Sequence, residues 1–215
     1  MTWIFTGDSI THGLKHTVGV RSYSEHIHEI LRGDLLRTRD TIVNTAVTGN
    51  RIIDILDDFD HRVGRWGPDI VVLMIGTNDC ARRGRDSPIA LGEFPESIAE
   101  FVSRVRDLGA TPILQTPPPV DAASATEHTL IELFAQAIRD VAAQESVLLI
   151  DQYSFLTGLA MEGAPLSMMS DDIHPNAAGH AALALNLAAE IGIVSTNTRT
   201  IDVLRQLAGL PDVSD

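Results

Sequence analysis

The chain has 215 residues with a hydrophobic fraction of 44% and a charged fraction of 21%, which is typical of one globular domain rather than a disordered or fibrous chain. Its formal net charge of −13 disfavours nucleic acid and anionic membranes as partners, because both would repel an acidic surface. The single cysteine, Cys80, excludes an internal disulfide and fits a reducing compartment.

Short β-branched runs alternate along the chain with segments of helical periodicity. Five runs predict strands: Thr2–Thr6, Thr41–Ala46, Asp69–Ile75, Thr111–Thr116 and Val147–Asp151. Apolar residues spaced by three and four positions predict five helices: Tyr23–Leu36, Arg51–Val63, Pro95–Leu108, Thr126–Ala143 and Asn176–Ile191.

This alternation predicts an α/β fold with one parallel sheet and helices on both faces. Right-handed crossovers bring the carboxyl ends of all strands to one edge, where such sheets bind ligands. We expect one domain over residues 1–195 and a tail over 196–215 that forms no independent domain. Neither a basic, apolar leader nor a run approaching the ~20 residues of a membrane span is found, so we expect a soluble, cytoplasmic protein.

Gly7-Asp8-Ser9 follows the first predicted strand directly. A serine at that point projects from the carboxyl edge of the sheet, where a turn can expose both its hydroxyl and its amide. By itself the tripeptide is equally compatible with an ordinary turn or a helix cap.

Asp171-Asp172-Ile173-His174-Pro175 lies just before the last predicted helix. A serine hydroxyl becomes nucleophilic when an imidazole removes its proton, and the imidazole needs an acceptor on its other nitrogen. Asp171, three residues before His174, can curl back to that nitrogen on a tight turn, whereas Asp172 lacks this spacing. A capping aspartate followed by a surface histidine is the alternative interpretation.

Two further polar segments follow predicted strands. Gly76-Thr77-Asn78-Asp79 follows the third strand, and Asn78 there could donate its side-chain amide to a developing oxyanion. The segment Asn44–Gly49 follows the second strand and could supply a backbone amide to the same place.

Taken together and in this order, the four segments resemble the signature blocks of the GDSL, or SGNH, hydrolase family. The resemblance covers nearly the whole chain and implies a three-layer α/β/α sandwich, flavodoxin-like, with about five parallel strands. It implies a serine ester hydrolase without a cofactor or metal, which acts on a small-molecule acyl ester. Ser9 would be the nucleophile, His174 the base and Asp171 the residue that orients it, with an oxyanion hole formed by Ser9, Ala46 and Asn78.

One position departs from the family pattern. The family usually has glycine where this chain has Ala46. Alanine still donates its backbone N–H, but its methyl group predicts a tighter acyl site or a slightly displaced donor. Together with the acidic surface, this favours a short-chain ester.

Several alternatives remain open from the sequence. His12 could serve Ser9 as base, and Cys80 could act as a nucleophile, although a solvent-facing histidine and a buried structural thiol are the simpler interpretations. The same site could perform acyl transfer, belong to a phosphatase or metal hydrolase, or have become a silent binding module. The sequence leaves the oligomeric state undetermined.

Overall fold

The computed structural model contains one parallel five-stranded sheet with strand order β2-β1-β3-β4-β5. It describes residues 1–14, 16–82, 88–121, 123–163, 167–194 and 199–211. The strands are β1 (Thr2–Gly7), β2 (Thr41–Asn44), β3 (Ile70–Met74), β4 (Thr111–Gln115) and β5 (Leu148–Ile150). The expected flavodoxin-like α/β/α architecture is confirmed.

The sheet is buried on both faces because its strands are apolar at consecutive positions. In β1, Ile4 packs on one face, while Trp3 and Phe5 pack on the other. Central strand β3 pairs with β1 from Trp3↔Ile70 to Gly7↔Met74, so both strands end at the same level. Continuous apolar runs of this kind suit a parallel sheet covered by helices on both sides.

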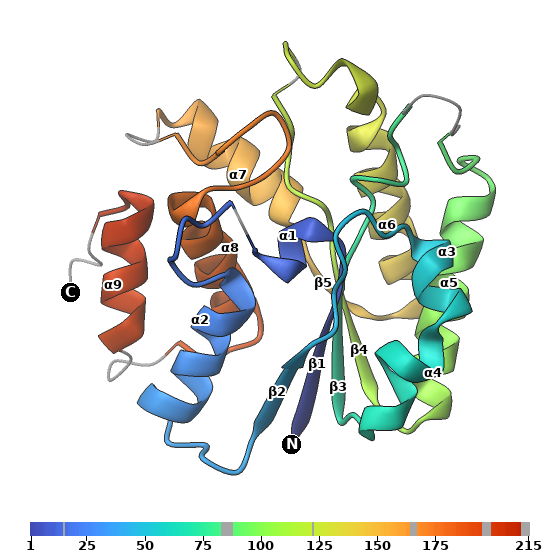
Figure 1. Cartoon of the computed structure of the whole chain (residues 1–215), viewed down its shortest axis with the longest axis horizontal. Helices are drawn as coiled ribbons and strands as arrows, with labels where there is room; N and C mark the ends of the chain where they lie inside the picture. The colour runs from blue at the N-terminus through green and yellow to red at the C-terminus, as the bar shows by residue number, and fades with distance from the viewer. Residues whose placement is uncertain (15, 83–87, 122, 164–166, 195–198, 212–215) are drawn as a thin grey trace.

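Helices cover the two faces in separate groups (Figure 1). The core on one face includes residues of α2 (Tyr23–Glu29), α7 (Gln152–Met161), α8 (Ala177–Glu190) and α9 (Arg199–Ala208). The core on the other face includes residues of α3 (Ile52–Asp57), α5 (Glu93–Asp107) and α6 (Ile131–Glu145), with Phe59 of α4 (Phe59–Arg62) packed against it. The short segments are α1 (Ser9–His12), the π-helical η1 (Ile30–Asp34) and the 3-10 helices η2 (Gly64–Trp66) and η3 (Thr126–His128).

The helix predictions differ from the structure at four places. The expected helix over Tyr23–Leu36 is α-helical only to Glu29 and continues as η1, and the one over Thr126–Ala143 begins as η3 and becomes α-helical from Ile131. The expected helix over Arg51–Val63 divides into α3 and α4 at Asp58, whose backbone angles of φ −113 and ψ 27 are not helical. Helix α7 lies in a segment that the sequence leaves as a connection, since its Phe, Leu, Ala and Met residues show no clear helical period. Its start is stabilised by Asp151, whose side chain accepts from the Ser154 amide.

The last described segment packs against the domain. Helix α9 lies beside α8 (Figure 1), and it buries Ile201, Leu204 and Ala208 in the same core as α2 and α8. The amphipathic part of the tail therefore extends one helical layer. Within the described residues, the helices are too short or too polar to cross a bilayer.

Candidate active site

Ser9 stands at the carboxyl edge of the sheet because β1 ends at Gly7 and α1 begins at once. The Asp8 side chain caps α1 by accepting from the Ile10 amide at 2.9 Å. Gly7 permits the close approach of β1 to β3, since a Cβ there would lie 2.1 Å from the carbonyl oxygen of Met74. This turn holds Ser9 half-buried at the end of β1.

His174 and Asp171 lie on a tight turn that precedes α8. The Ser170 amide donates to the carbonyl of His174, and the Asn176 amide donates to that of Met168. Asp171 Oδ1 accepts from the amides of Ile173 and His174 at 3.0 and 2.8 Å. The aspartate therefore shapes the turn with its own side chain, and this places its carboxylate beside the histidine ring.

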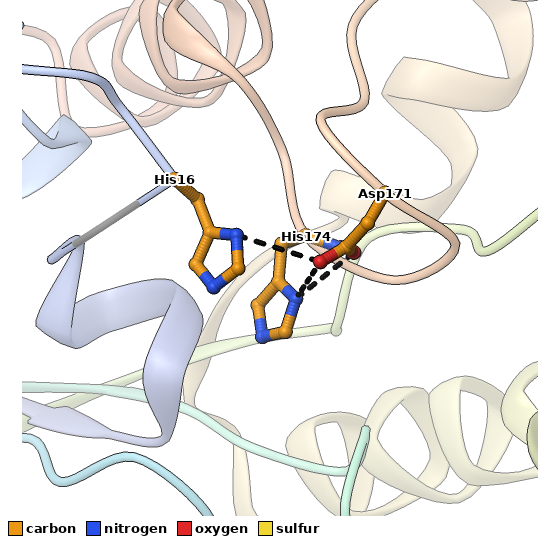
Figure 2. A group of neighbouring side chains, drawn as sticks. All are labelled: His16, Asp171 and His174. Carbon is orange, nitrogen blue, oxygen red and sulfur yellow. Dashed lines mark hydrogen bonds and ion pairs between the residues drawn. The ribbon is translucent and has the colours of Figure 1, made fainter.

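The fold joins the serine and the histidine across 165 positions of sequence. Ser9 Oγ lies 2.9 Å from His174 Nε2, and His174 Nδ1 lies 2.9 and 2.8 Å from the two Asp171 oxygens. Figure 2 shows the Asp171 carboxylate facing the His174 ring. Burial opposes ionisation of Asp171, but the Ile173 amide and the His174 ring outweigh it, so the pKa of Asp171 lies below its ordinary value.

The two segments expected to supply oxyanion donors reach the same edge, but only one has its donor available. The Asn78 side chain donates one N–H to the carbonyl of Asn50 at 3.0 Å, which fixes its orientation while the amide group keeps a second N–H. The Ala46 amide instead donates to Asn44 Oδ1 at 3.0 Å. Our assignment of Ala46 to the oxyanion hole is therefore corrected, because its hydrogen is held by the Asn44 side chain.

The sequence also matches a known family. The model of the GDSL-like lipase/acylhydrolase family covers residues 5–182, which includes all four polar segments. This chain belongs to that family.

Relatives of this GDSL-like protein include esterases. An acetylxylan esterase of Geobacillus stearothermophilus is 24% identical over an alignment of 210 positions, and the match covers 91% of this chain and 96% of the relative. LAE5, an alpha/beta hydrolase enzyme from the metagenome of Lake Arreo, Spain, is 25% identical with a TM-score of 0.78, over 91% of this chain and 96% of that structure. Axe2, the Geobacillus enzyme, superposes over the same shares with a TM-score of 0.75 at 23% identity. The GDSL-like chain is a carboxylic ester hydrolase.

Two pockets lie near the turn that carries Asp171 and His174 in the GDSL-like domain. One, of about 450 Å³, is lined by Asp171 and His174 together with residues 124–128. The second, also about 450 Å³, is more apolar and is lined by Leu156, Met168 and Met169 among others. Since only the first includes His174, it is the candidate substrate cleft.

The alternative catalytic residues lie elsewhere. His12 Nδ1 pairs with Thr48 Oγ1 at 3.1 Å. Cys80 is fully buried and donates to the carbonyl of Thr77, as expected for a structural thiol. Sequence reasoning missed His16, whose ring stacks on His174. Its only sequence signal is its place seven residues after Ser9, which no local spacing rule connects to His174.

A buried carboxyl group lies beneath the site and should make stability depend on pH. Asp79 is 0% exposed. Burial, reinforced by the charge of Asp8 and opposed by a hydrogen bond from the Ile52 amide, raises its pKa to about 7. Above about pH 4 the folded state therefore keeps a proton that the unfolded state releases. The stability of the folded protein falls as the pH rises from about 4 towards 7, where the buried carboxyl group ionises.

Asp79→Asn removes this titration and should change the pH dependence of unfolding. As the pH rises from 5 to 8, the free energy of unfolding of the variant should increase by about 2–3 kcal/mol relative to that of wild type, since one pKa unit corresponds to about 1.4 kcal/mol. Urea unfolding of both proteins at each pH measures the difference. If the free energies of unfolding of variant and wild type differed by the same amount at pH 5 and pH 8, a raised pKa at Asp79 would be contradicted. Buried His26 and His180, with pKa values lowered mainly by burial to about 4 and about 3, titrate in both proteins and cancel.

Proposed function

We propose that this ester hydrolase cleaves a short-chain acyl ester through a Ser9–His174–Asp171 triad and an acyl-enzyme. The observation that carries the proposal is the unbroken hydrogen-bond chain from Ser9 Oγ through both His174 nitrogens to Asp171. This chain provides a nucleophile, a base and a carboxylate that stabilises the protonated base.

In the first half of the reaction, Ser9 Oγ forms a bond to the ester carbonyl carbon while its proton moves to His174 Nε2. The carbonyl π electrons move to the oxygen and give a tetrahedral oxyanion. When the carbonyl re-forms, the bond to the alcohol oxygen breaks and His174 returns its proton to that oxygen. The alcohol leaves, and Ser9 carries the acyl group.

Water repeats the sequence in the second half. His174 Nε2 takes a proton from water as the water oxygen adds to the acyl carbon. The second tetrahedral intermediate collapses by breaking the bond to Ser9 Oγ, which regains a proton from His174. The acid is released and the enzyme returns to its starting protonation state.

Three N–H groups are available to stabilise the oxyanion in this proposal. Two are the amide of Ser9 at the start of α1 and the second side-chain N–H of Asn78. As the third donor we propose the backbone amide of Gly49, on the same loop, in place of that of Ala46. Gly49 has φ +88, and among the described residues other than its chain neighbours no heavy atom lies within 4 Å of where its Cβ would stand. Asn78 binds the carbonyl of the next residue, Asn50, and this bond ties the two donor segments together.

Catalytic mutants of Axe2 support these roles. In three of its solved structures a catalytic serine, aspartate or histidine is replaced by alanine. In that protein the aspartate and histidine are three positions apart, as Asp171 and His174 are. The relative's name, acetylxylan esterase, supports an acetyl group on a polar alcohol as the preferred substrate here.

Labelling and a substrate panel test the proposal together. A fluorophosphonate should modify Ser9, which peptide mass spectrometry can locate, and acetyl esters should be hydrolysed faster than octanoyl esters. Adding a competing alcohol separates hydrolysis from acyl transfer, because a transferase would form a new ester. Labelling of another residue, or preference for the long acyl chain, would contradict the proposal.

A further inference from the structure

His16 covers one face of the His174 ring. The two imidazoles are nearly parallel, with an interplanar angle of 9° and 3.7 Å between ring centroids. Figure 2 shows the rings side by side, with an Nδ1 of each directed at the Asp171 carboxylate. Both side chains are mostly buried, with 16% of His16 and 15% of His174 exposed.

Polar contacts hold His16 in this position. Its Nδ1 lies 3.2 Å from Ser170 Oγ and 3.5 Å from Asp171 Oδ2. His16 follows α1, which ends at His12 with Gly13 as its C-cap, so the segment that begins with Ser9 returns over the turn bearing His174. One stretch of chain thus supplies the nucleophile and covers the base that serves it.

We propose that His16 is a positioning residue that holds the His174 ring in the plane required for proton transfer. The inference rests on the proposed role of His174 as base. Hydrogen bonds at Nδ1 and Nε2 lie in the ring plane and leave the ring free to tilt about the line that joins them. A flat ring stacked at 3.7 Å resists this tilt, which would misalign the Nε2 lone pair and Ser9 Oγ.

The contact with Asp171 also suits the charge that develops during the reaction. When His174 takes the serine proton it becomes a cation, which the Asp171 carboxylate stabilises. His16 Nδ1 and His174 Nδ1 face one oxygen of that carboxylate, Asp171 Oδ2. His16 therefore acts through His174 and Asp171.

A metal site is the competing interpretation of the same three residues, since their ligand atoms lie within 4.8 Å of one another. The ring geometry opposes it. A metal bonds along the in-plane lone pair of an imidazole, and in parallel rings these lone pairs run side by side rather than converge. The Asp171 oxygens are also engaged by the turn amides and His174.

Three substitutions at position 16 distinguish the contribution of the aromatic ring from that of the polar Nδ1 atom. His16→Phe keeps a flat ring without Nδ1, His16→Asn keeps a polar group near the Nδ1 position without the ring, and His16→Ala removes both. We expect His16→Ala and His16→Asn to lower kcat about 3- to 10-fold, the range that corresponds to one aromatic pair, with KM nearly unchanged. His16→Phe should restore kcat to within about 2-fold of wild type. The downfield proton resonance of the His174–Asp171 hydrogen bond should persist in His16→Phe and broaden in His16→Ala.

His28→Ala is the matched control, because it removes an imidazole from helix α2 and should leave kcat unchanged. Wild-type kcat in His16→Ala, or restoration by Asn but not by Phe, would overturn the inference. If His16→Ala fails to fold, the comparison of Phe with Asn decides alone. Loss of activity in Ser9→Ala together with unchanged kcat in His16→Ala would leave the triad intact and reject only the role of His16, whereas full activity in Ser9→Ala would reject the triad.

Discussion

Replacing Ser9 with alanine should lower kcat by about 10⁴–10⁶, because the acyl-enzyme can no longer form. His174→Ala should cause a loss of similar size, and the double variant should be little worse than either single one. Members of a nucleophile–base pair act as a unit, so the second removal has almost nothing left to abolish. Steady-state rates on an acetyl ester, with unfolding temperatures to verify folding, measure all three variants.

Ser97→Ala provides the control for this experiment. Ser97 lies on the exposed side of α5, where its hydroxyl donates to the Glu93 carbonyl, and alanine is favourable in a helix. Its kcat should equal that of wild type. More than about a tenth of wild-type kcat in Ser9→Ala would exclude a serine acyl-enzyme, since the donors that remain give only a small part of the rate enhancement.

Replacing Asp171 with asparagine should lower kcat by about 10³–10⁴ without disrupting the turn. The Asn oxygen can still accept from the amides of Ile173 and His174, as Oδ1 does in the wild type. Its NH₂ group then occupies the place of Oδ2 and faces His174 Nδ1. The ring must accept there and carry its hydrogen on Nε2, so it can no longer take a proton from Ser9.

Asp172→Asn is the natural comparison, because it removes a carboxylate from the same turn one residue away. It should retain kcat within about 2-fold, as expected for an exposed side chain. Asp171→Ala should lose turn stability as well as kcat, which an unfolding temperature would detect. If Asp171→Asn were nearly active and Asp172→Asn inactive, the orienting role would belong to Asp172, and the assignment to Asp171 would be wrong.

The sequence determined the layered fold and the edge at which its polar segments meet. Continuous apolar runs such as Ile70–Met74 are suited to strands buried on both faces, and their alternation with helical periods leaves few arrangements besides a parallel sheet. The contact between Asp171 and His174 was also predictable, because three residues on one turn can reach each other without the rest of the protein.

Contacts between distant segments required the tertiary structure. The separation of Ser9 from His174 is set by how β1 and the turn before α8 sit on the sheet, and no local pattern encodes the 2.9 Å between them. The stacking of His16 and the use of the Ala46 amide by Asn44 follow from side-chain directions in loops, where backbone geometry is not periodic. Periodicity is a local property that can be read from the sequence. The alignment of a nucleophile, a base and its supporting ring exists only once the packed core has fixed the segments that carry them.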